Sequence, residues 1–80
     1  GVAMTVREWM GNDEILRMDL MTGSGYIQLE RTDFQTVLHG GTVRAHLGCK
    51  ESEHEISPED FIDEEVTSDY VRDGVLYGIA

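Results

Sequence analysis

The segment that decides the fold is residues 14–31, which reads EILRMDLMTGSGYIQLER. Apolar and polar residues alternate on both sides of its glycine-rich centre. This period of two is typical of half-buried strands, because successive side chains point to opposite faces. The segment therefore predicts a β-hairpin, with strands over residues 14–21 and 26–31 and a turn over residues 22–25. The apolar residues that we expect on its inner face are Leu16, Met18, Leu20, Ile27 and Leu29.

Alternation of the same kind continues towards the C-terminus. Residues 42–50 alternate small or apolar residues with polar ones and predict a further strand. Residues 66–71 and 75–79 predict two more strands, and the Arg-Asp-Gly sequence at residues 72–74 between them is typical of a hairpin turn.

Helix starts follow a pattern of their own: a hydroxyl residue, then three positions later a side chain that can bond back to the free backbone N–H groups. The three pairs of this kind are Thr5 with Glu8, Thr32 with Gln35, and Ser57 with Asp60. Apolar residues at helical spacing follow each pair, as Phe61, Ile62 and Val66 do after the third. We therefore expect three short helices, the third with Pro58 at its first position.

Together these elements predict an α+β fold: a small antiparallel or mixed sheet of about five strands with two or three short helices mainly on one face. A chain of 80 residues has room for one domain with a small core. We place that domain over residues 4–80, because the Gly-Val-Ala at residues 1–3 before Met4 looks like a cloning remnant.

Net charge excludes several classes of partner. The chain has 16 acidic and six basic residues and a formal charge of -10. It would repel DNA, RNA and anionic bilayers, so we expect no direct nucleic-acid or membrane binding. No apolar run is long enough to span a bilayer, and Cys49 is the single cysteine, so no intrachain disulfide can form. We expect a cytoplasmic protein.

The charge is concentrated in one segment. Residues 1–50 hold six acidic and five basic residues, a net charge of -1, whereas residues 51–80 hold ten acidic residues and one basic residue, a net charge of -9. A solvated acidic surface that keeps a small domain soluble is one explanation. Solubility alone, however, does not require so uneven a distribution.

The acidic segment is therefore our candidate partner-binding site. Carboxylates spaced along such a segment resemble the phosphates of a nucleic-acid strand and could occupy a groove that binds DNA or RNA. We expect a basic surface of a host protein as the partner, such as that of a nuclease or another nucleic-acid-binding protein. The residues that we expect to bind it are Glu51, Glu53, Glu55, Glu59, Asp60, Asp63, Glu64, Glu65 and Asp69.

In size and acidity the chain is similar to the small phage and mobile-element proteins that inhibit host defence nucleases, such as anti-CRISPR and anti-restriction proteins. The similarity is one of molecular type and involves no shared motif. It implies an inhibitor that blocks a nucleic-acid-binding surface without chemistry of its own. The alternative is a structural or adaptor protein that acts through a hydrophobic face or as a homodimer, with the acidic segment serving only solubility.

Catalytic and metal sites are not expected. His46, Cys49 and His54 are three potential Zn²⁺ ligands, but in a strand His46 and Cys49 would point to opposite faces. The acidic residues after Cys49 favour its thiol form and disfavour a nucleophilic role. The glycine-rich stretches do not match phosphate-binding loops. We therefore expect no enzyme activity, metal or cofactor.

Overall fold

The computed structural model describes residues 2–23, 25–46 and 53–80, without the side chains of Glu53, Asp60 and Asp69. Its strands form one seven-stranded sheet in the order β1-β6-β7-β2-β3-β4-β5. The strands are β1 (Val2–Thr5), β2 (Arg17–Thr22), β3 (Gly25–Glu30), β4 (Val43–His46), β5 (Glu53–Ile56), β6 (Glu65–Arg72) and β7 (Val75–Ile79). The helices are α1 (Val6–Met10), α2 (Arg31–Leu38) and the 3-10 helix η1 (Pro58–Asp60).

The predicted α+β fold with about five strands is wrong. The chain is mostly sheet, with seven strands in the described residues and only two short α-helices. The prediction lacked β1 and β5, each of four residues. Such short strands show little alternation and form by pairing with distant segments, β1 with β6 and β5 with β4. Val2 and Ala3, left outside the predicted domain, pair with Ser68 and Thr67.

The central hairpin forms as predicted. β2 and β3 pair in antiparallel register, with Met18 opposite Leu29 and Leu20 opposite Ile27, and all four side chains are buried. Leu16 differs from its prediction, since it precedes β2 and is more than half exposed.

The C-terminal hairpin also forms as predicted, but its position in the sheet was not foreseen. β6 and β7 join through Asp73 and Gly74, whose φ values of 52° and 79° are typical of a tight hairpin turn. β7 then runs parallel to β2, with Tyr77 opposite Asp19. The two hairpins thus meet in the middle of one mixed sheet.

The helix starts were predicted with mixed success. α1 has the expected capping box, in which the Glu8 backbone N–H donates to Thr5 Oγ1 and the Thr5 N–H donates to Glu8 Oε1. α2 begins before the predicted pair, and the Glu30 N–H donates to the Asp33 carboxylate at 2.9 Å.

The predicted third helix is replaced by the single turn η1. Its expected cap is missing, because the Ser57 side chain makes no capping hydrogen bond. Val66, assigned to this helix by its spacing, is instead in β6 opposite Met4. Phe61 and Ile62 are nevertheless buried, so these apolar residues attach the turn to the core.

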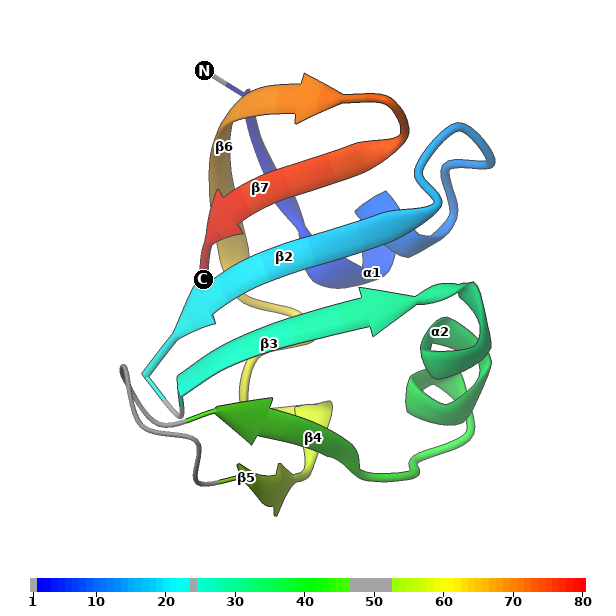
Figure 1. Ribbon diagram of the computed structural model, residues 1–80, viewed down its shortest axis with the longest axis vertical. Coiled ribbons are helices and arrows are strands. Elements are labelled where there is room, and N and C mark those ends of the chain that lie inside the picture. The colour runs from blue at the N-terminus through cyan, green and yellow to red at the C-terminus, as the bar shows by residue number, and fades with distance from the viewer. Residues whose placement is uncertain (1, 24, 47–52) are drawn as a thin grey trace.

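All three helices cover one side of the sheet, which we call the inner side. Figure 1 shows the sheet from the opposite, outer side, with α1 behind it. The core lies between the inner side and the helices, and it includes Val6 and Trp9 of α1, Phe34 of α2, and Phe61 next to η1. In the described part of the chain, no helix has the length and apolar character needed to cross a bilayer.

Candidate functional site

The structure gathers part of the predicted acidic site on one segment. Residues 57–65 run from β5 to β6, strands that lie far apart in the sheet, and so cross the inner side of the molecule. Four carboxylate side chains on this segment are exposed, and we call them the acidic crossing: Glu59, Asp63, Glu64 and Glu65. Buried Phe61 and Ile62 between them attach the segment to the core.

Other predicted residues lie apart from the acidic crossing. Glu55 is on β5 next to Arg44 of β4, and strand alternation turns both side chains to the outer side. Asp60 belongs to η1, Glu53 to β5 and Asp69 to β6, and the structure describes the backbone of these three residues. Glu51 lies outside the described residues.

Helix α1 holds the acidic crossing in place. The Arg7 backbone N–H donates to the Ile62 carbonyl at 3.0 Å. The Arg7 guanidinium forms a two-point ion pair with Asp63, with Nε–Oδ1 and Nη2–Oδ2 distances of 2.8 and 3.3 Å. This hydrogen bond and the opposite charge raise the pKa of Arg7 and lower the pKa of Asp63. Asp63 therefore positions the segment, and Glu59, Glu64 and Glu65 present its charge.

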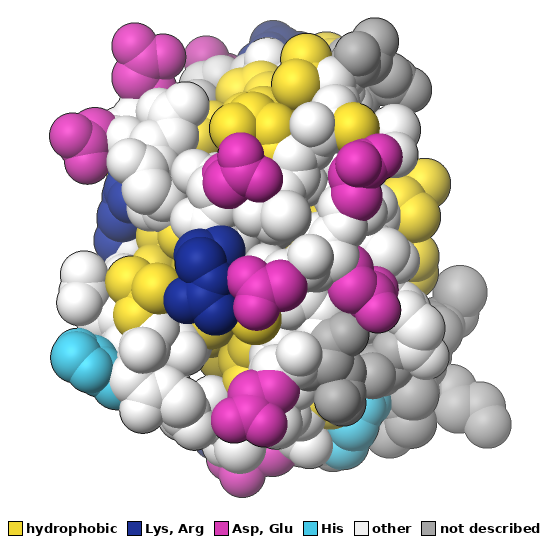
Figure 2. All heavy atoms as spheres, turned by 180° about the vertical axis from the view of Figure 1, so that it is seen from behind, with side chains coloured by type: hydrophobic (Ala, Val, Ile, Leu, Met, Phe, Trp, Pro, Cys, Tyr) yellow, Lys and Arg dark blue, Asp and Glu magenta, His cyan; other side chains and the backbone are white. Residues whose placement is uncertain are grey.

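Carboxylates are distributed over this side of the molecule. Figure 2, the view from behind Figure 1, shows acidic side chains separated by neutral and hydrophobic atoms, with fewer basic groups among them. Among the side chains that the structure describes, carboxylates predominate on this surface without forming one continuous stripe.

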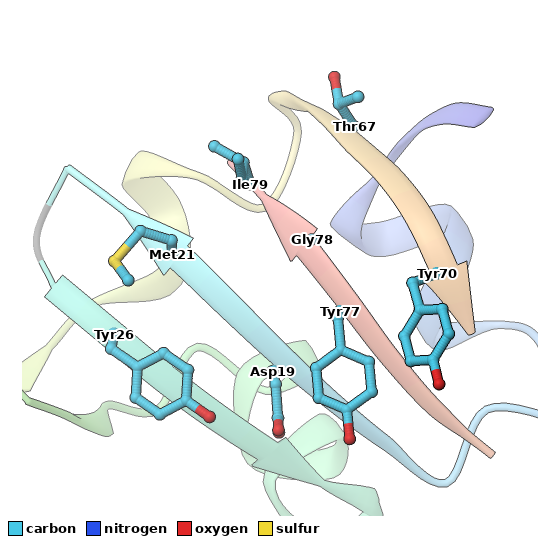
Figure 3. Close-up of a pocket in the computed structure, with 8 residues that line it drawn as sticks. All are labelled: Asp19, Met21, Tyr26, Thr67, Tyr70, Tyr77, Gly78 and Ile79. Atoms are coloured by element: carbon cyan, nitrogen blue, oxygen red, sulfur yellow. The ribbon is translucent and has the colours of Figure 1, made fainter. Parts of the chain in front are cut away.

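The outer side of the sheet has a different character. All three tyrosines of the chain lie there, on β3, β6 and β7. With Met21 and Ile79 they surround an open hollow of about 340 Å³, shown in Figure 3. We call these five residues the tyrosine face: Met21, Tyr26, Tyr70, Tyr77 and Ile79.

Strand register brings the tyrosine face together. Met21 of β2 lies between Tyr26 of β3 and Ile79 of β7. Tyr77 of β7 lies opposite Tyr70 of β6, and their ring centroids are 5.5 Å apart with the rings tilted by 37°. That distance is within the range of favourable aromatic pairs.

A β-bulge in β6 explains the place of Tyr70. Thr67 faces Ile79 on the outer side, and regular alternation would turn a residue three positions later to the inner side. The register shift between Ser68 and Tyr70 reverses the alternation, so that Tyr70 also faces outward. The Ser68 hydroxyl donates to the Tyr77 carbonyl at 2.8 Å and ties the bulge to β7.

A buried carboxylate, paired with an arginine, lies beneath the tyrosine face. Asp19 is only 5% exposed and accepts from Arg17 at two points, with Nε–Oδ1 and Nη2–Oδ2 distances of 2.9 and 3.2 Å. The bond to Asp19 and its charge raise the pKa of Arg17. Burial raises the pKa of Tyr26, whose phenol oxygen accepts from Gln28 at 3.1 Å. The hollow is therefore lined by tyrosine rings and a paired charge.

The sequence does not predict the tyrosine face. Its alternation correctly turns Arg17 and Asp19 away from the core, which suggests a polar, solvated outer side. One signal was available: Tyr26 occurs in phase with the outward residues Gln28 and Glu30. The outward position of Tyr70 does not follow from the sequence alternation, because it depends on the bulge.

The three potential zinc ligands named from the sequence are His46, Cys49 and His54. His46 and His54 are on neighbouring strands, but alternation places them on opposite faces of the sheet. Cys49 lies outside the described residues. Within residues 2–23, 25–46 and 53–80, no three His, Cys, Asp or Glu side chains are grouped closely enough to hold a metal ion.

Comparison of the chain with protein-family models, with curated proteins and with solved structures found no match.

Proposed function

We propose that this protein is a non-enzymatic inhibitor of the phage or mobile-element type, whose acidic crossing docks on a basic surface of a nucleic-acid-binding host protein. The observation that supports the proposal is the uneven charge: -1 over residues 1–50 and -9 over residues 51–80. On this proposal the partner's groove is filled by carboxylates in place of phosphates.

The geometry suits docking without chemistry. Glu59, Glu64 and Glu65 are exposed on a segment that the buried residues Phe61 and Ile62 anchor to the core. Because the backbone of this segment is anchored, it does not have to be ordered on binding, which favours affinity. The field of the carboxylates also attracts a basic partner before contact, so salt should slow association. We place this activity in the cytoplasm, in line with the single cysteine.

A pair of charge-reversed variants tests the proposal. Glu59→Lys/Glu64→Lys changes the acidic crossing, and Asp13→Lys/Glu14→Lys makes the same change of net charge, from -10 to -6, in an exposed loop before β2. The partner is captured from a lysate of the native host with the wild-type protein, purified, and titrated with each variant at low and high salt.

We expect the crossing variant to bind at least about tenfold more weakly, as the loss of about 1.4 kcal/mol implies, and the loop variant to lose much less. Wild-type binding should weaken steeply with salt. Equal affinity of all three proteins would overturn the proposal. Equal loss in both variants would assign binding to net charge alone.

A second candidate function is an adaptor that acts through a hydrophobic or dimer interface. The tyrosine face favours it, because large side chains are exposed together there. Under this alternative the Glu59→Lys/Glu64→Lys variant would keep its affinity for the partner, and binding would respond little to salt.

A further inference from the structure

We propose that the tyrosine face is a homodimer interface, in which two copies of the chain pack outer side to outer side around a two-fold axis. This inference does not rest on the proposed function. It is based on the exposure of four side chains in the tyrosine face: Met21 is 52% exposed, Tyr70 51%, Tyr77 41% and Ile79 66%. Contiguous exposed apolar side chains of this size on a small soluble domain mark interaction sites.

The size of the face fits a stable interface. A half-exposed tyrosine or similar side chain offers about 100 Å² of surface. The residues of the tyrosine face together therefore supply about half of the 800 Å² per partner that a standard interface buries, and about half of such an interface is apolar. The remainder can come from the polar rim, since the view in Figure 1 spans 29 × 27 Å.

The arrangement of the tyrosine face allows a two-fold contact between unlike side chains. Figure 3 shows Met21 and Ile79 towards one end of the hollow, with the tyrosine rings reaching towards the other. A two-fold axis in the plane of the interface, between these ends, would set each copy's Met21 and Ile79 against the partner copy's tyrosines. Such an isologous contact uses the same residues twice, as closed dimers do. Methionine adapts well to such a contact, and its sulfur packs favourably against aromatic rings.

Charge would oppose self-association of a protein at -10, and Glu30 and Glu65 add carboxylates to the outer side, but each arginine of that side lies beside a carboxylate. Arg17 is paired with Asp19, Arg72 lies 3.5 Å from Asp73, and Arg44 is opposite Glu55 in the strand register. Glu59, Asp63 and Glu64 of the acidic crossing lie on the other side of a molecule whose shortest dimension is 22 Å, whereas Glu65 is in phase with the outward Thr67 of β6. Because the Debye length is about 8 Å at physiological salt, repulsion between the two acidic sides is strongly screened.

The dimer and the docking of a basic partner therefore respond to salt in opposite ways. Added salt weakens binding through the acidic crossing, and it strengthens a dimer held by tyrosine and aliphatic contacts. The dimer also carries two acidic crossings that point away from each other, so one assembly can engage two basic surfaces.

Sedimentation velocity over a wide range of protein concentrations tests the inference. Wild-type protein should sediment as a reversible dimer, and the dissociation constant should not rise with salt. Ile79→Asp places a charge against the partner copy's tyrosines within the interface and should weaken the dimer at least about 30-fold. Leu38→Asp, an equal change at an exposed leucine of α2 outside the tyrosine face, should leave it unchanged.

Circular dichroism shows whether each variant is folded, and Met21→Lys replaces Ile79→Asp if the latter is not. A wild-type monomer at all concentrations, or a folded Ile79→Asp variant that dimerises as well as Leu38→Asp, would overturn the inference. Folded Ile79→Asp should still bind the basic partner, so failure of the dimer and failure of the acidic docking are separate results.

Discussion

The two surfaces of this molecule are built in opposite ways. The acidic crossing comes from one continuous segment, residues 57–65, in which exposed carboxylates flank the two buried side chains that anchor it. The tyrosine face combines residues from four strands, and Tyr26 and Tyr77 are more than fifty positions apart in the chain. One surface is charged and local, and the other is neutral and assembled by strand pairing. A segment's composition can reveal the first kind of surface, but not the second.

The largest expected effect is on the free energy of unfolding, and it is tested by replacing one isoleucine from each surface. Ile62, under the acidic crossing, is 6% exposed, whereas Ile79, on the tyrosine face, is 66% exposed. Ile62→Ala should lower the free energy of unfolding by about 2–5 kcal/mol, because it leaves a cavity in the core. Ile79→Ala should lower it by less than about 1 kcal/mol in the monomer. Urea denaturation of dilute protein measures both, and equal losses would contradict the assignment of Ile79 to an exposed face.

A smaller effect is expected at the bulge that turns Tyr70 outward. Ser68→Ala removes the hydrogen bond to the Tyr77 carbonyl and should cost about 1 kcal/mol. It should also weaken the dimer, because Tyr70 loses its support, while the affinity of the acidic crossing for a basic partner stays the same. Denaturation and sedimentation velocity check the two outcomes. A variant with unchanged stability and dimerisation would show that the bulge does not depend on this bond.

The smallest effect concerns pH and the ion pair between Arg7 and Asp63. The pKa of Asp63 is lowered in the folded state, so its contribution to stability is present above the unfolded pKa and is lost as pH falls through the folded value. Asp63→Asn should therefore make stability less dependent on pH below about pH 4. Urea denaturation of both proteins across the acidic range measures this difference. Parallel pH profiles would show that the pair does not hold the acidic crossing.

The sequence predicted those parts of the fold in which neighbouring residues suffice. Met18, Leu20, Ile27 and Leu29 follow the strict alternation of a half-buried hairpin, and all four are buried. The Thr5 capping box likewise depends on residues three positions apart. The prediction of a third helix was wrong because neighbouring residues did not suffice there. The apolar spacing at Phe61 and Ile62 suits a helix and an anchored turn equally well. Val66 does not continue that helix, because it pairs with Met4 of the distant strand β1.

For the candidate sites, the sequence by itself determined the acidic residues and their concentration after residue 50. Only the tertiary structure decided which carboxylates lie together, because Glu55 and Glu59 are close in the chain and yet face different sides. It alone also placed β7 beside β2 and reversed the alternation at Tyr70. Charge and alternation are properties of neighbouring residues, whereas a surface depends on contacts between strands that are far apart in the chain.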